Sequence, residues 1–122
     1  MTFKPYEGKE DDLQATCAYY LNLHPKAFFC HVPNGGNRNP REGAKFKRMG
    51  VRAGMPDLLI FNATAINDVY YRGLAIELKV KGGKLRENQV NALEELKRLG
   101  WYVAVCFSFD EFEAVVKYYF NE

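Results

Sequence analysis

Residues 74–80 constrain the fold of this chain most, because Leu, Ile, Leu and Val alternate there with other side chains. Successive side chains of a β-strand point to opposite faces, so the pattern predicts a strand with one fully apolar face. Glu77 and Lys79 then share the other face, about 7 Å apart at the usual rise of a strand. We interpret this separation as too long for a simple ion pair and as suited to gripping a metal ion and a water.

Apolar periodicity and turn residues divide the whole chain into elements in the order α, β, β, β, α, β, α. Segments with helical spacing are 7–23, 84–99 and 108–120. Segments with strand character are 26–32, 57–61, 70–80 and 101–107. The last strand is expected to be central because both of its faces are apolar, and a helical turn or two is expected around 44–49. This order predicts an α/β fold with a mixed sheet flanked by helices, in one domain of residues 1–122.

The composition is that of an ordinary globular protein, with 48% hydrophobic residues. No run approaches the about 18 apolar residues needed to span a bilayer, and no signal-peptide pattern opens the chain. Cys17, Cys30 and Cys106 match no zinc or disulfide spacing, so buried free thiols are expected. These features predict a soluble protein of the cytoplasm with no membrane partner.

Basic residues are concentrated in one segment, although the net charge of the chain is only +2. Residues 38–52 carry six basic side chains against the single acidic Glu42. The six are Arg38, Arg41, Lys45, Lys47, Arg48 and Arg52. A second basic cluster consists of Lys79, Lys81, Lys84 and Arg86. Concentrated positive charge suits a polyanion such as DNA, and a solvated surface is the alternative.

Pro56-Asp57 opens the apolar strand that precedes residues 74–80. If these two strands are neighbours, Asp57 can reach the same point as Glu77 and Lys79. Two carboxylates can hold a divalent cation, and a lysine supplies positive charge where negative charge develops during phosphodiester hydrolysis. For so short a pattern the alternative is a solvated sheet face, with Asp57 capping a turn.

Two further polar residues are predicted to face inward. Glu10 lies on the stripe that the first helix buries with Leu13 and Cys17, where an unpaired carboxylate is unfavourable. Either a shared metal ion or a salt bridge to a lysine would satisfy it, and both remain open. Gln89 shares the inward face of its helix with Leu85, which indicates a hydrogen bond near the site or, alternatively, to the backbone.

Several motifs occur together over nearly the whole chain. They are residues 50–58 (Gly-Val-Arg-Ala-Gly-Met-Pro-Asp-Leu), 76–79 (Ile-Glu-Leu-Lys), Gly82-Gly83, Leu85, Gln89, Glu10, Gln14 and the Asn-Gly-rich loop 34–37. The combination resembles the virus-type replication-repair nuclease (VRR-NUC) family of the PD-(D/E)xK nuclease superfamily. The resemblance implies a restriction-endonuclease-like core and a Mg²⁺- or Mn²⁺-dependent, structure-specific DNA nuclease. Stand-alone members of this size resemble homodimeric Holliday-junction resolvases of bacteria and phages, acting in DNA repair, whereas members fused to larger proteins cut flaps as monomers.

The resemblance also implies roles for individual residues. The implied metal ligands are Asp57, Glu77, the backbone carbonyl of Leu78, and Glu10 directly or through water. Lys79 would orient or activate the attacking water, and Gln89 would position Lys79 or the phosphate.

His31 is interpreted as a satisfied strand histidine, with a phosphate contact as the alternative. A catalytically silent nucleic-acid-binding module is the competing function from another class.

Overall fold

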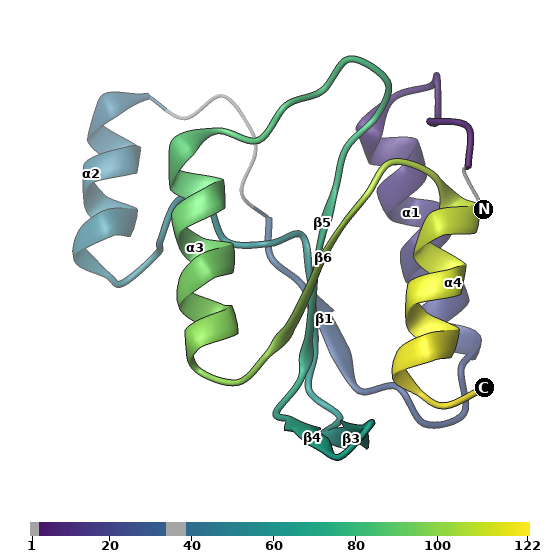
Figure 1. Ribbon diagram of the computed structural model, residues 1–122. Helices are drawn as coiled ribbons and strands as arrows, with labels where there is room; N and C mark the ends of the chain where they lie inside the picture. The colour runs from purple at the N-terminus through teal and green to yellow at the C-terminus, as the bar shows by residue number, and fades with distance from the viewer. Residues whose placement is uncertain (1–2, 34–38) are drawn as a thin grey trace.

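The computed structural model describes residues 3–33 and 39–122, and its centre is a four-stranded sheet in the order β1-β2-β5-β6 (Figure 1). The strands are β1 (Phe29–His31), β2 (Leu58–Ile60), β5 (Leu74–Leu78) and β6 (Tyr102–Cys106). β2 is antiparallel to both β1 and β5, whereas β6 is parallel to β5. The predicted mixed sheet is therefore confirmed.

Helices cover both faces of this sheet (Figure 1). α1 (Glu10–Leu23) and α4 (Phe109–Tyr119) lie together on one face, and α3 (Glu87–Arg98) lies on the other. The main core fills the space between the sheet and the pair α1 and α4. Its fully buried members include Leu13, Leu58, Leu74, Ile76, Leu78, Phe112 and Val116. The predicted α/β architecture with flanking helices is confirmed.

The alternation in β5 works as the sequence predicts. Leu74, Ile76 and Leu78 belong to the core and are fully buried. Glu77 faces the other side of the sheet, where Gln89 of α3 forms a hydrogen bond with it. One strand thus contributes to the core with one face and to a polar pocket with the other.

The prediction that the last strand is central is wrong. β6 is an edge strand of the sheet, and β5 is its one neighbouring strand in the described part of the chain. Both faces of β6 are apolar because α3 packs against one and α4 against the other. Apolar faces report what lies above and below a strand, whereas its place in the sheet depends on backbone pairing.

The prediction of one continuous strand over 70–80 is also wrong, and the segment between 61 and 70, to which the sequence assigned no strand, contains one. β3 (Thr64–Ile66) and β4 (Val69–Tyr71) form a separate antiparallel hairpin. Asn67 and Asp68 at its tip have φ values of 50° and 67°. Positive φ at both positions is typical of a two-residue type I′ turn, which these two residue types favour.

The basic segment forms a longer helix than the expected turns around 44–49. α2 (Pro40–Arg48) begins after Asn39, whose side chain accepts a hydrogen bond from the Glu42 N–H at 2.8 Å. Asparagine is a favourable N-cap, and proline fits the first helical position. Arg38 and the Asn-Gly-rich loop 34–37 lie outside the described residues.

The cysteines follow the prediction only in part. Cys17 and Cys106 are buried free thiols, and burial raises the pKa of Cys17 to about 12. Cys30 is exposed, so its predicted burial is wrong. It lies on the edge strand β1, whose residues are exposed or half-buried. Among the described residues, no helix is both long and apolar enough to cross a membrane.

Candidate active site

Asp57 lies directly before β2, beside the end of β5. The register of the two strands places Leu58 opposite Ile76, which puts Asp57 across from Glu77. The Leu78 backbone N–H donates a hydrogen bond to Asp57 Oδ2 at 2.7 Å. Because the N–H and C=O of one strand residue point to the same side, the Leu78 carbonyl also faces the β2 side. β2 and β5 are neighbours, which was the condition for Asp57 to reach the same point as Glu77.

Gly54 fixes the turn that leads to Asp57 against the start of α3. Its φ is 84°, and an added Cβ would lie 2.6 Å from the backbone oxygen of Asn88. Glycine alone adopts this conformation readily and also permits so close an approach. The loop before Asp57 and the first turn of α3 are therefore held together, and they form two adjoining walls of one pocket.

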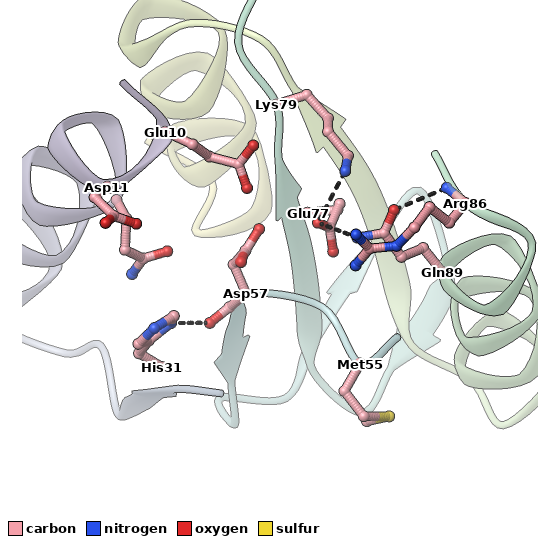
Figure 2. Close-up of a pocket in the computed structure, with 10 residues that line it drawn as sticks. Glu10, Asp11, His31, Met55, Asp57, Glu77, Lys79, Arg86 and Gln89 are labelled. Carbon is pink, nitrogen blue, oxygen red and sulfur yellow. Dashed lines mark hydrogen bonds and ion pairs between the residues drawn. The ribbon is translucent and has the colours of Figure 1, made fainter. Parts of the chain in front are cut away.

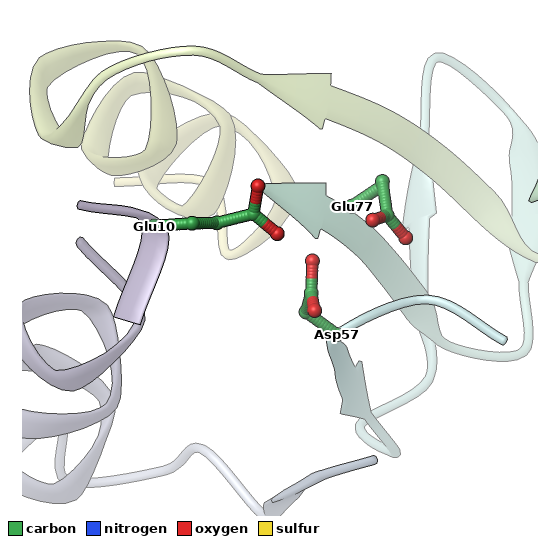
Figure 3. Close-up of side chains that lie close together, drawn as sticks. All are labelled: Glu10, Asp57 and Glu77. Carbon is green, nitrogen blue, oxygen red and sulfur yellow. The ribbon is translucent and has the colours of Figure 1, made fainter. Parts of the chain in front are cut away.

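Three carboxylates meet at this end of the sheet (Figure 3). Glu10 from α1, Asp57 and Glu77 each offer an oxygen atom within 4.8 Å of the others. No described lysine or arginine forms a salt bridge with Glu10, so it joins the acidic cluster. Glu7, three residues earlier and before the start of α1, lies outside this cluster and pairs with Lys81 at 3.1 Å.

The cluster is electrostatically unfavourable without a cation. Burial, followed by the nearby Asp57 carboxylate, raises the pKa of Glu77 to about 8. Burial, followed by the charge of Asp57, also raises the pKa of Glu10. Glu77 Oε2 is buried and has no hydrogen-bond partner among the described residues. This set of oxygen donors, one of them unsatisfied, fits a hard divalent cation such as Mg²⁺ or Mn²⁺.

Lys79 lies next to the cluster and is only 6% exposed. Its Nζ is 3.9 Å from Glu77 Oε1. The prediction that strand spacing excludes this ion pair is therefore wrong. The spacing sets the distance between Cα atoms, whereas the flexible four-carbon side chain of lysine can bring Nζ back to Glu77.

Gln89 of α3 forms a hydrogen bond with Glu77 from the wall of the pocket that α3 provides. Its Nε2 donates a hydrogen bond to Glu77 Oε1 at 3.1 Å, and its Oε1 accepts one from the Arg86 backbone N–H at 2.9 Å. Both sequence interpretations thus hold in part, since the amide bonds to the site and to the backbone. Its site contact is with Glu77 rather than with Lys79, so any positioning effect acts on Glu77.

These groups line one pocket of about 240 Å³ (Figure 2). Its lining also includes five residues that the sequence prediction did not assign to the site: Asp11, Gln14, His31, Met55 and Arg86. Both polar atoms of the Gln14 amide are buried without a hydrogen-bond partner in the described chain. The sequence signal for Gln14 was its place one turn after Glu10. His31 Nδ1 donates to the Asp57 carbonyl oxygen at 2.8 Å, as expected of a satisfied strand histidine.

The described basic residues predicted to bind DNA do not line this pocket. Those on α2 are all exposed: Arg41, Lys45, Lys47 and Arg48. α2 stands beside α3, on the side away from α1 and α4 (Figure 1). Arg52 and Lys84 are exposed in the loops before β2 and α3, and Lys81 pairs with Glu7. The sixth residue of the basic segment, Arg38, is outside the described residues.

Comparison with known proteins identifies the family. The model of the VRR-NUC domain matches residues 8–110. The chain belongs to the VRR-NUC family. A solved structure described as a VRR_NUC domain protein is 29% identical to this VRR-NUC domain, with a TM-score of 0.78 over 97% of this chain and 91% of that chain. A search of curated proteins found no match.

The family assignment confirms the resemblance that the motifs indicated, and it makes this chain a nuclease-type domain. The structural likeness also confirms the restriction-endonuclease-like fold. The carboxylates of the VRR-NUC domain, Glu10, Asp57 and Glu77, all lie within the matched residues.

Proposed function

We propose that this VRR-NUC domain is a metal-dependent, structure-specific DNA endonuclease that resolves branched DNA in the manner of a Holliday-junction resolvase. The convergence of Glu10, Asp57 and Glu77 with Lys79 in one pocket carries this proposal. Buried polar groups usually have a hydrogen-bond partner, so the unpartnered Glu77 Oε2 beside two further acids favours a cation site over a purely structural cluster. Clusters of this kind are typical of sites where a divalent cation and a phosphate meet.

The three carboxylates, Lys79 and Gln89 then each have a defined task. The carboxylates, with the Leu78 carbonyl, would hold Mg²⁺ or Mn²⁺, which supplies a Lewis acid for the phosphate and lowers the pKa of a bound water. Lys79 orients the attacking water and stabilises negative charge developing on the phosphate. Gln89 keeps the Glu77 carboxylate in one orientation through its hydrogen bond at 3.1 Å. Asp57 is oriented in the same way by the backbone N–H of Leu78.

The exposed basic residues supply the contacts to DNA outside the pocket. The four described basic residues of α2, with Arg52 and Lys84, face solvent and can approach phosphates on the arms of a branched substrate. Contacts of this kind position the duplex without reading its sequence. We therefore propose selection by DNA shape.

We also infer that the domain acts as a homodimer through the open edge of β6, because a symmetric junction offers two equivalent strands to cut. The five residues of β6 are uncharged, although exposed edge strands are normally protected by charge, proline or a bulge. Tyr102 and Cys106 bond to the β5 side, so the backbone groups of Val103 and Val105 point outward. An antiparallel pair of β6 strands centred on Ala104 would match Val103 of one copy with Val105 of the other.

This dimer is tested by the molecular mass in solution. Gel filtration with light scattering should give the mass of two subunits for the wild type. Val103→Pro removes an outward backbone N–H that the paired strand would need, a change that an unpaired edge strand tolerates, and it should shift the mass toward one subunit. A wild-type mass of one subunit at working concentration would refute the dimer.

The nuclease proposal is tested with a panel of synthetic four-way junctions, flaps and linear duplexes, in Mg²⁺ or Mn²⁺. We expect the wild type to cut the junction, and Lys79→Ala to bind it with little loss and not to cut it. Equal cutting by both proteins would refute the mechanism. Cleavage of flaps with indifference to the four-way junction would assign the same fold to a flap nuclease. DNA binding without cutting in either metal would assign a silent binding module.

A further inference from the structure

Arg86 occupies the N-cap position of α3, where arginine is unfavourable. Helices usually begin with Ser, Thr, Asp or Asn, whose side-chain oxygen accepts a hydrogen bond from a free N–H of the first turn. Arginine has no acceptor atom, and the Arg86 side chain makes no cap hydrogen bond. Its positive charge also lies at the positive end of the helix dipole.

The rest of the capping motif is intact. Gln89, the third residue of α3, accepts a hydrogen bond from the Arg86 N–H at 2.9 Å, which is the return half of a capping box. The start of α4 shows the missing half, since Ser108 Oγ accepts from the Glu111 N–H at 3.1 Å. The capping box at the start of α3 therefore lacks only the side-chain acceptor at the N-cap, and a serine in place of Arg86 would supply it.

The side chain of Arg86 lines the pocket of the three carboxylates (Figure 2). Arg86 and Lys79 lie on the α3 side of this pocket, whereas Glu10 and Asp11 lie on the α1 side. Arg86 forms no salt bridge with any residue in the described ranges, and its positive charge acts on the acidic cluster only at longer range, where it opposes the rise that burial and Asp57 cause in the pKa of Glu10. Natural proteins break local rules of this kind mainly at functional sites.

We propose that Arg86 binds a phosphate of the DNA strand that is cut, on the wall opposite Glu10. This inference rests on the nuclease function proposed above. A guanidinium binds two oxygens of one phosphate through parallel hydrogen bonds, and an anion is favoured at the start of a helix. A bound phosphate thus offsets both unfavourable features of Arg86 at the N-cap. Lys79 contacts the reacting group, and Arg86 fixes the orientation of the strand.

Arg86→Ser is the decisive variant, because serine can complete the N-cap. We expect it to unfold at the same temperature as the wild type or at a higher one, so that a loss of activity cannot come from misfolding. Cutting of the junction at saturating DNA should fall about 10- to 100-fold, as for a lost hydrogen bond to a charged group. Arg86→Lys keeps the charge without the paired donors, and it should recover only part of the rate.

Lys97→Ser is the matched control, because it removes the same charge from the exposed end of the same helix, outside the pocket. We expect it to cut DNA at the wild-type rate. An equal loss of cutting in both variants would show a general charge effect and would overturn the assignment to Arg86.

A second readout does not depend on cleavage. In EDTA, binding of a labelled junction is followed by fluorescence anisotropy over a range of salt concentrations. Arg86→Ser should lower the slope of log K against log salt by about 1, as expected for one lost phosphate contact. In a series of junctions, one phosphate of the cut strand is replaced by an uncharged methylphosphonate, at a different position in each junction. At one position the replacement should weaken binding by the wild type and leave binding by Arg86→Ser unchanged.

The outcomes separate this inference from the proposed function. An unchanged salt slope and unchanged cutting by Arg86→Ser overturn the role of Arg86 even if the wild type is an active nuclease. A wild type that cuts no substrate, while Arg86→Ser lowers the slope, refutes the nuclease function and supports the phosphate contact.

Discussion

Replacing Glu77 by glutamine should stabilise the metal-free protein at alkaline pH while it abolishes cleavage. Glutamine has the same shape as glutamate, and its oxygen can still accept the hydrogen bond that Gln89 donates to Glu77 Oε1. The substitution removes the negative charge of a residue that is only 2% exposed and that lies beside Asp57 and Glu10. The variant therefore separates the electrostatic cost of the cluster from its packing.

The magnitude follows from the pKa of Glu77. Burial, then the nearby Asp57, raises this pKa from 4.5 to about 8 in the folded protein. The folded state thus holds the proton on Glu77 more tightly than the unfolded state does. The contribution of this proton to the free energy of unfolding is complete below about pH 4.5 and is lost as the pH rises toward 8. At about 1.4 kcal/mol for each pKa unit, the loss is at most about 5 kcal/mol. We expect at least about 2 kcal/mol, because solvent at the open side of the pocket screens part of the interaction.

The assay is urea unfolding in EDTA at about pH 5 and about pH 9, on either side of the window in which Glu77 titrates. The wild type should lose more stability between the two conditions than Glu77→Gln does. Glu94→Gln, an exposed substitution on α3, serves as the control and should follow the wild type. Added Mg²⁺ should stabilise the wild type at about pH 9 and stabilise Glu77→Gln much less. The same pH dependence in all three proteins would refute the reasoning.

Two further predictions concern the walls of the pocket. Gly54→Ala should lower the free energy of unfolding by at least about 2 kcal/mol in urea, because Cβ would meet Asn88 at a positive φ. Gly43→Ala on α2, where an added Cβ meets nothing within 4 Å, should instead be neutral or stabilising, and an equal loss in both would contradict this. Gln14→Leu should raise the stability of the metal-free protein by about 1 kcal/mol, since it removes a buried amide without partners. The same variant should slow cleavage of the junction, and wild-type rates would show that the amide has no role.

Local patterns were sufficient where a single element decides the outcome. Helical spacing predicted a helix over 108–120, and α4 begins directly after Ser108, whose side chain accepts a hydrogen bond from the Glu111 N–H. Gly100 after α3 has a φ of 96°, as expected of a helix C-terminus. The hairpin β3–β4 had a readable signal in Asn67-Asp68, two residues between short strands, which the polarity of the segment obscured.

The position of β6 could not be predicted in the same way. Two helices bury its faces and leave its edge open, and the sequence pattern records only the faces. The ion pair between Lys79 and Glu77 was missed for a different reason, because it depends on side-chain rotamers rather than on strand spacing.

The sequence by itself determined the parts of the site that lie on one element or in one motif. Alternation along residues 74–80 placed Glu77 and Lys79 on one face, and helix periodicity turned Glu10 and Gln89 inward. Only the tertiary structure decided that Glu10, Asp57 and Glu77 share one cluster and that Arg86 enters it. Periodicity along the chain reports the direction of each side chain relative to its own element. The distance between elements is set by strand pairing and by close packing such as that of Gly54 on α3, which no local pattern encodes.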